Sequence, residues 1–283
     1  MKKYKEKVMG GVFLFCALVS VLAVILICLF LFANGLPAMG KIGVFDFLLG
    51  EKWAPGNDIY GIFPMILGSL YVTAGAVILG VPLGILTAVF MARFCPRRLY
   101  RLIKPAINLL SGIPSIVYGF FGMVALVPMV RHVFGGDGNS ILTASILLGM
   151  MILPTIIGVA ESSLRAVPES YYEGALALGA SHERSVFFTV LPAAKSGIFA
   201  GVVLGIGRAV GEATAVMMIA GNQARIPDSI LKGVRTLTSN IVMEMGYAGD
   251  LHREALIATA VVLFIFILII NVSLSLFKRR SGK

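Results

Sequence analysis

The stretch ESSLRAVPESYYEGALALGASHERSVFFTVLP, residues 161–192, is rich in charge within a chain whose other long segments are almost entirely apolar. Pro168 is suited to the first turn of a helix, which Gly179 can end in a left-handed cap. Ser181 can then cap a second short helix, whose exit Pro192 would mark. Two short helices joined at a glycine are typical of a docking site for a soluble partner. The alternative interpretation is a solvated loop that merely joins two apolar segments.

The segments on both sides of this insert have the length and composition of membrane-spanning helices. The chain has 283 residues, of which 58% are hydrophobic and 13% are charged, and a helix needs about 20 apolar residues to cross a bilayer. The sequence therefore predicts an all-α integral membrane protein with six transmembrane helices. Residues 1–58 would form an N-terminal anchor helix and the first outer loop, and residues 59–283 a core of five helices. Charge-free runs of sufficient length are residues 8–40, 59–92, 105–130, 139–160 and 255–277, and a sixth run, 196–224, is interrupted only by Arg208 and Glu212.

The net charge of +10 is explained by membrane topology rather than by binding to nucleic acid. Six spans place both termini on the same side of the membrane, where sixteen of the 24 Lys and Arg residues fall, against seven in the three opposite loops. Loops rich in Lys and Arg stay in the cytoplasm during insertion. We therefore expect both termini and residues 161–192 to be cytoplasmic.

The sequence carries no pattern that predicts catalysis. It has no GxxxxGK[ST] phosphate loop, and its three histidines are far apart. The three cysteines predict no disulfide framework, because Cys16 and Cys28 lie in the first apolar run and Cys95 lies in an expected cytoplasmic loop. We expect a protein that is not an enzyme and that holds no metal or cofactor of its own.

The stretch LSGIPSIVYG, residues 110–119, interrupts the third expected span. Gly112 and Pro114 favour a break in the helix, and Ser115 can cap the part that follows. A broken membrane helix directs backbone N–H groups with partial positive charge into a cavity, an arrangement that suits an anion. The alternative interpretation is a packing kink beside another helix.

The fifth expected span carries two charges inside an apolar run. Seven residues bring an α-helix back to within about 20° of the same direction, so Arg208 shares a face with Gly201, and Glu212 lies one turn further on. A charge at the bilayer centre costs about 2.5–3.5 kcal/mol on insertion scales, which favours a functional role. Arg208 would meet a passing anion while Glu212 positions it; the alternative is a structural Arg208–Glu212 bridge that holds two helices together. The glycines whose four-residue spacing permits close helix packing are Gly197, Gly201 and Gly205, and likewise Gly207 and Gly211.

The charged insert resembles the cytoplasmic EAA motif of the permeases of ABC importers. The resemblance implies a type I permease fold, in which the loop 161–195 contains a coupling helix. That helix would dock on a partner ATPase, which would bind ATP and Mg²⁺. The motif falls on Glu173, Gly174, Ala175, Gly179, Leu191 and Pro192, and the chain departs from it at Gly174, where Ala is usual, and at Thr189, where Ile is usual.

Four further segments resemble the phosphate-uptake permeases within that family: residues 53–61, 113–119, 205–212 and 248–252. The resemblance implies that Arg208 and Glu212 match family positions associated with phosphate passage, and Ser115 at the expected helix break completes the candidate path. It also implies a heterodimer with a PstA-like permease, a PstB-like ATPase dimer and an extracytoplasmic phosphate-binding protein. The expected location is the inner membrane of a bacterial or archaeal cell.

The residues alone leave other functions open. One is a permease for another oxyanion, such as sulfate or molybdate. A second is a self-sufficient secondary transporter, against which stand a single acid–base pair at the membrane midplane and the lack of an evident inverted repeat. A non-transporting scaffold would leave Arg208 and the insert without a reason. The long polar loop at 225–252 is expected either to meet an extracytoplasmic partner or to be solvated.

Overall fold

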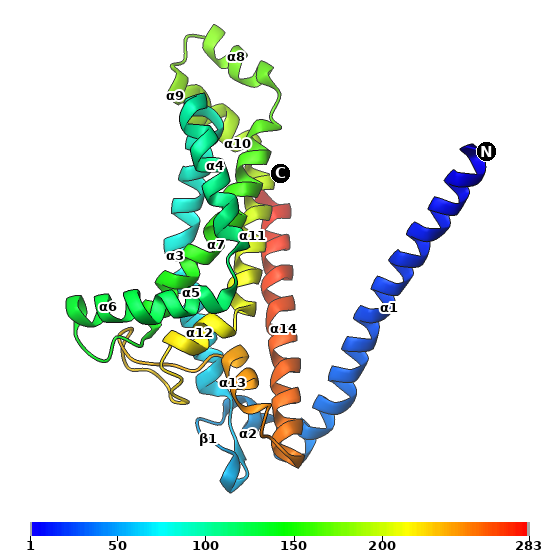
Figure 1. The fold of residues 1–283 in the computed structure, drawn as a ribbon, viewed down its shortest axis with the longest axis vertical. Coiled ribbons are helices and arrows are strands. Elements are labelled where there is room, and N and C mark those ends of the chain that lie inside the picture. Colours follow the sequence, from blue (N-terminus) through cyan, green and yellow to red (C-terminus); the bar gives the residue numbers. More distant parts are fainter. Residues whose placement is uncertain (1, 282–283) are drawn as a thin grey trace.

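The computed structural model describes residues 2–281, with the side chains of residues 9–273, 275 and 276. Side chains of the basic residues at the two ends of the chain, which entered the topology prediction, lie outside these described residues. Helices α3 (Phe63–Val89), α7 (Ile141–Arg165), α11 (Lys195–Gly211) and α14 (Asp250–Ser281) run side by side. Helix α1 (Lys2–Ile42) leans away from this bundle, and only the carboxyl end of α1 meets α14 (Figure 1).

By length and composition, the described residues contain five helices able to cross a membrane, and six, as expected, when one bent pair is counted as a single span. That pair joins residues 182–193 to α11 across a bend of 69°. The expected fifth span, 196–224, is wrong at its end: α11 stops at Gly211, α12 covers only Thr214–Ile219, and the chain then leaves the helical path. The helix is interrupted at Glu212, whose backbone is extended with ψ 122°.

The third expected span, 105–130, is also placed wrongly. Helix α4 (Arg97–Gly112) begins eight residues earlier and ends at the predicted break, where Ile113 and Pro114 are extended. The chain continues as α5 (Ser115–Phe121), a π-helical segment η3 (Gly122–Leu126) and α6 (Val127–Phe134). Figure 1 shows α5 and α6 lying crosswise to the long helices. A search for charge-free runs does not find the start of α4, because this helix begins with arginines.

Close packing of the bundle depends on glycine, as the spacing predicts. A Cβ on Gly201 or Gly205 of α11 would press into Val159 or Ile156 of α7, and one on Gly80 of α3 would press into Ile152. The same prediction is not met by Gly207 and Gly211, because a Cβ there would meet nothing within 4 Å in the part of the chain that the structure describes. These two glycines leave an open face on α11.

The end of the bundle that was expected to lie outside the cell is more ordered than a solvated loop. After α2 (Val44–Leu49), strand β1 (Trp53–Ala54) pairs antiparallel with β2 (Ile59–Tyr60) around the 3-10 turn Pro55–Asn57. The polar loop at 225–252 contains α13 (Leu237–Glu244), which packs against α14. Apart from these two short strands and an isolated bridge between Gly221 and Val234, the regular structure of the described residues is helical.

The opposite end carries the insert, which projects beyond the bundle (Figure 1). It holds α8 (Glu169–Ala177), α9 (His182–Ser185), the π-helical turn η4 (Val186–Val190) and α10 (Leu191–Ala193). The predicted glycine cap is confirmed: Gly179 has φ +85°, and the N–H groups of Gly179 and Ala180 close a Schellman pair of hydrogen bonds on Leu176 and Ala175. Ser181 caps α9 as predicted, by accepting from the backbone of Arg184.

Two predicted boundaries in the insert are wrong. Pro168 is the residue before α8 rather than within its first turn, because its ψ of 137° is extended. Pro192 does not mark an exit, since the helical path runs through it and bends only after Ala193. A proline in the first turn of α10 removes no hydrogen bond that the helix needs, so it is tolerated there. The insert also starts after Arg165 rather than at the expected residue 161, because α7 extends to Arg165.

Candidate functional site

The candidate path for a substrate lies where two broken helices meet. Glu212 follows the last residue of α11 and is half-buried. One carboxylate oxygen, Oε1, accepts from the backbone N–H of Ala215 at 3.1 Å and so satisfies the start of α12, while Oε2 accepts from the Ser115 hydroxyl at 3.1 Å. The backbone carbonyl of Glu212 accepts from Thr238 Oγ1 at 3.0 Å. Glu212 therefore joins three separate segments at one point.

Ser115 is the first residue of α5, directly after the break in the third span. The expectation that it caps this helix is wrong: no side-chain cap is made there, and its hydroxyl is directed instead to Glu212. Tyr118, one turn later, donates its hydroxyl to the carbonyl of Leu110 at 2.8 Å. That carbonyl is one of the groups at the end of α4 that have no partner within the helix, so Tyr118 stabilises the break itself.

Arg208 lies four residues before Glu212 on α11 and is half-buried. The expected Arg208–Glu212 bridge is not formed, because the carboxylate of Glu212 is turned toward Ser115 and Ala215. Arg208 forms no hydrogen bond or ion pair with any residue that the structure describes, although its charge acts on Tyr118. A guanidinium inside a span, beside a polar helix break and without a counter-charge, is available to an anion.

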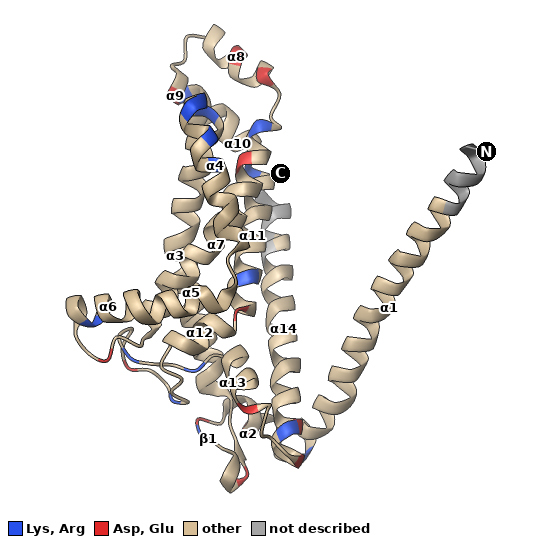
Figure 2. Ribbon diagram, in the orientation of Figure 1, with Lys and Arg blue, Asp and Glu red and all other residues tan. Residues whose placement is uncertain are grey.

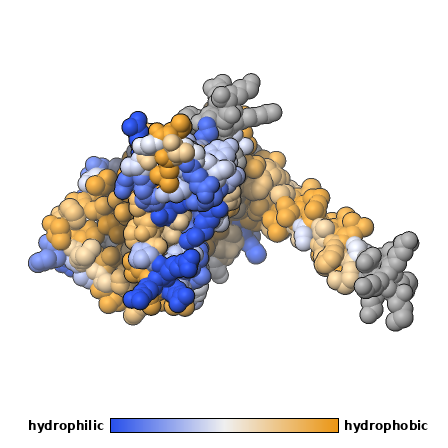
Figure 3. All heavy atoms as spheres, turned by 90° about the horizontal axis from the view of Figure 1, so that it is seen from above, coloured by the Kyte–Doolittle hydropathy of each residue, from blue (hydrophilic) through white to orange (hydrophobic). Residues whose placement is uncertain are grey.

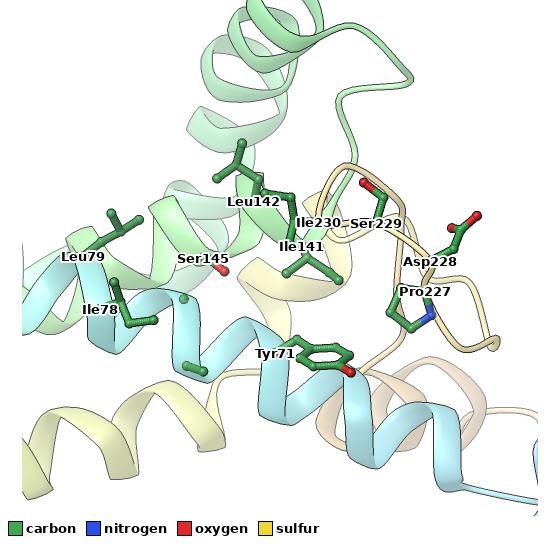
Figure 4. A pocket seen from close by; sticks show the side chains of 12 residues that line it. Tyr71, Ile78, Leu79, Ile141, Leu142, Ser145, Pro227, Asp228, Ser229 and Ile230 are labelled. Carbon is green, nitrogen blue, oxygen red and sulfur yellow. The ribbon is translucent and has the colours of Figure 1, made fainter.

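Two cavities among the described residues differ in size and in lining. Beside Glu212 there is a cavity of about 10 Å³, lined by Thr73, Thr236 and Thr238 among others, which has room for about one water molecule. A second cavity, about 490 Å³, lies between α3, α7 and the loop 227–230 (Figure 4). Its lining includes Tyr71, Ile78 and Leu142 but no Lys, Arg or His. The cavity beside Glu212 therefore has no room for an oxyanion, and the second cavity offers an anion no cation.

Four of the six predicted coupling residues lie together at α8 and the turn that follows it. Glu173, Gly174 and Gly179 are exposed, Ala175 is half-buried, and Leu178 is 91% exposed. Leu191 and Pro192 lie apart from them, half-buried and exposed respectively, at the return of the insert to the bundle. Figure 3, which looks onto this end, shows polar residues gathered over it and apolar residues around the sides of the molecule.

The insert is held to the bundle by a few polar contacts. Arg93, in the π-helical turn η2 (Phe90–Phe94) after α3, pairs with Glu169 of α8 at 2.9 Å and donates to the carbonyl of Leu164. The hydroxyl of Tyr172 lies 2.7 Å from His182 Nδ1, which joins α8 to α9. Helix α8 is therefore largely exposed and is attached to the bundle through Glu169.

Sequence reasoning missed two buried glutamates, one at each end of the bundle. Figure 2 shows charged residues gathered toward these ends. Glu161 of α7 accepts from Tyr100, Lys104 and Arg165, and we call these four residues the inner cluster. The hydrogen bond to Glu161 raises the pKa of the Tyr100 hydroxyl above its usual value.

The second buried glutamate is Glu244 of α13. It accepts from Trp53 Nε1, from Arg235 and from His252 Nε2, at distances of 2.6 to 2.8 Å, and we call these four residues the outer cluster. Trp53 and His252 belong to the two segments, 53–61 and 248–252, whose resemblance to phosphate permeases was noted, but spacing gave no sign that they meet on Glu244.

No metal centre is formed by the described part of the chain, where no three His, Cys, Asp or Glu side chains gather closely enough to hold an ion. An apolar helical bundle with a polar break at its middle and an exposed helical insert at one end defines a membrane permease. Its fold is that of the type I permeases of ABC importers. The model of the family described as binding-protein-dependent transport system inner membrane component matches residues 80–283, and the chain belongs to this family.

Individual relatives agree with this assignment. The chain is 38% identical over 267 residues to the probable ABC transporter permease protein YqgH of Bacillus subtilis, covering 90% of this chain and 86% of that protein. It is 34% identical over 261 residues to the phosphate transport system permease protein PstC of Mesorhizobium japonicum, covering 85% and 80%. A bacterial alginate ABC transporter, solved with an alginate-bound periplasmic protein, aligns over 98% of both chains with a TM-score of 0.66 and 16% identity, a likeness of fold alone.

Proposed function

We propose that this chain is a permease subunit of an ATP-driven phosphate importer. Its relatives of known name include PstC phosphate permeases from several bacteria, at 32–34% identity over most of the chain. The single observation that carries the proposal is Arg208, an unpaired guanidinium among the described residues, next to the two helix breaks that meet at Glu212. Charge-assisted hydrogen bonds from Arg suit a phosphate oxyanion.

The path would be completed by a second permease. The open face at Gly207 and Gly211 lies on the same helix as Arg208, and the cavity beside Glu212 is too small for an oxyanion. A PstA-like permease packed on this face would enclose the passage between the two chains. Phosphate would then pass Arg208, Glu212 and Ser115, delivered by an extracytoplasmic phosphate-binding protein.

Energy would come from a partner ATPase of the PstB type, acting as a dimer that binds ATP and Mg²⁺. It would dock on α8 around Glu173, Gly174 and Ala175, where Leu178 offers exposed apolar surface and Gly179 sets the turn. The positive-inside distribution supports a cytoplasmic position for this insert and for both termini.

The experiment is phosphate uptake by the complete complex in proteoliposomes with Arg208→Ala. We expect the complex to assemble and uptake to fall about 10- to 100-fold, which corresponds to the loss of roughly 1.5–3 kcal/mol from charged hydrogen bonds. Arg208→Lys should retain part of the uptake, since Lys keeps the charge without the fork of donors. Arg225→Ala, which removes an exposed charge outside the spans, is the control.

Uptake by Arg208→Ala equal to that of Arg225→Ala would exclude this role of Arg208. Competition with sulfate and molybdate in the same assay separates phosphate from the other oxyanions. A self-sufficient secondary transporter does not fit a family that depends on a binding protein.

A further inference from the structure

The inner cluster is centred on Glu161, a buried charged side chain at the end of the bundle that carries the insert. The side chain of Glu161 is 3% exposed, and both of its oxygens are used: Oε1 accepts from the Tyr100 hydroxyl at 2.7 Å and from Arg165 Nε at 2.9 Å, and Oε2 accepts from Lys104 Nζ at 2.6 Å. Tyr100 and Lys104 belong to α4, whereas Arg165 belongs to α7. A single carboxylate thus ties one helix to the other.

On one side, the inner cluster is connected to the coupling helix. Arg165 is the last residue of α7, and only residues 166–168 separate it from α8. Its guanidinium also donates to the carbonyl of Met91 at 2.9 Å, in the same π-helical turn from which Arg93 reaches Glu169 of α8. A displacement of α8 would therefore act on the segment that holds Glu161.

On the other side, the inner cluster is connected to the candidate path. Helix α4 runs from the cluster to the break, where Tyr118 bridges back to Leu110 and Ser115 donates to Glu212. The helix is only lightly packed, since Ile107 is its one buried residue. Its position beside α7 therefore depends strongly on the bonds from Tyr100 and Lys104 to Glu161.

We propose that Glu161 is a positioning residue through which movement of the coupling helix α8 reaches α4, and hence the contact between Ser115 and Glu212. This inference rests on the proposed function, because it assigns Glu161 a part in coupling ATP hydrolysis to transport. The cations of the cluster fit such a joint: the side chains of Lys104 and Arg165 are 32% and 47% exposed, so they can shift while the carboxylate stays buried. An ion pair that only stabilised the fold would not need cations that are exposed to water.

The test is Glu161→Gln in the complete complex, with phosphate uptake and ATP hydrolysis measured in the same proteoliposomes. Gln has the same shape but no charge, so its bonds to Lys104 and Arg165 lose their ionic component. We expect hydrolysis to continue and uptake per ATP to fall about 5- to 100-fold, the range of ordinary coupling effects between sites. A role in structure alone would lower assembly and reduce uptake and hydrolysis in proportion, and this result would overturn the inference.

A second variant decides the question if Glu161→Gln does not assemble. Lys104→Met removes the ionic donor of α4 and leaves Glu161 bonded to Tyr100 and Arg165, so it should show the same fall in uptake per ATP. Lys104→Arg keeps an ionic donor and should restore the ratio. If the wild-type complex moves no phosphate, the proposed function fails. If it does move phosphate and Lys104→Met keeps the wild-type ratio, only the role of Glu161 fails.

Discussion

The inner and outer clusters have the same composition in outline and differ in what surrounds them. Each has one buried glutamate with three side-chain donors. In the outer cluster, Arg235 and His252 are each 15% exposed, and the ring of His252 packs against those of Trp53, Tyr60 and Tyr247. In the inner cluster, the cations reach water and their helices lead to an exposed insert.

The comparison indicates that the two ends of the permease have different roles. Enclosed donors and packed rings fix the outer cluster in one arrangement, which holds the β1–β2 hairpin, α13 and α14 together. Exposed donors on a lightly packed helix allow the inner cluster to change arrangement. We infer that the outer cluster mainly stabilises the fold, whereas the inner one mainly serves coupling.

The largest effect on stability should come from Glu244→Ala. It leaves Arg235 and His252 without their carboxylate in a nearly closed site, and removal of one partner from a buried pair costs about 3–5 kcal/mol. Thermal unfolding of the purified complex measures this loss. Glu161→Ala should cost less, since Lys104 and Arg165 can be hydrated.

The matched control is Glu254→Ala. Glu254 pairs with Lys41 at the same end of the bundle, but both side chains are well exposed, and such pairs contribute about 1 kcal/mol or less. If Glu244→Ala unfolds no earlier than Glu254→Ala, the outer cluster is not the rigid element that the comparison assumes.

A smaller effect is expected at Gly179, which tests the inner end without touching either cluster. A Cβ there would meet nothing within 4 Å, so only the backbone conformation at φ +85° opposes substitution. Valine in this region costs about 1–2 kcal/mol, whereas asparagine tolerates it. Gly179→Val should disturb the turn after α8 and lower uptake per ATP, and Gly179→Asn should stay close to wild type. Equal ratios for the two variants would count against docking through this turn.

Much of this architecture follows from local signals in the sequence. Apolar runs give the number of spans, Gly112 and Pro114 give the break in the third, and Gly179 and Ser181 give the turn between α8 and α9, because each of these depends on a few neighbouring residues. The end of α11 was missed because the apolar run continues past Glu212. The helix stops at this residue, whose carboxylate accepts a hydrogen bond from Ser115, 97 residues away.

The two clusters were missed for the same reason. Glu161 and Glu244 look like ordinary loop or helix-end charges in the sequence, and their donors lie between 4 and 191 residues away. Only Arg165, at four residues, gives a local sign of a pair. Long-range polar contacts have no periodicity, so a single sequence predicts the helices but not the bonds that join them.

The smallest predicted effect separates the two clusters most directly, because it removes one uncharged hydrogen-bond donor from each. Tyr100→Phe deletes the hydroxyl that donates to Glu161 and keeps the ring under the guanidinium of Arg165. Trp53→Phe deletes the indole N–H that donates to Glu244 and keeps an aromatic ring beside Tyr60 and His252. Each change should cost about 1.5 kcal/mol of stability, at the low end for a hydrogen bond to a charged group, because the carboxylate keeps its other two donors. Because only the inner cluster borders α4, Tyr100→Phe should in addition lower uptake per ATP, and Trp53→Phe should not. A fall in that ratio for Trp53→Phe, measured at a temperature where both variants are folded, would show that the outer end also moves during transport.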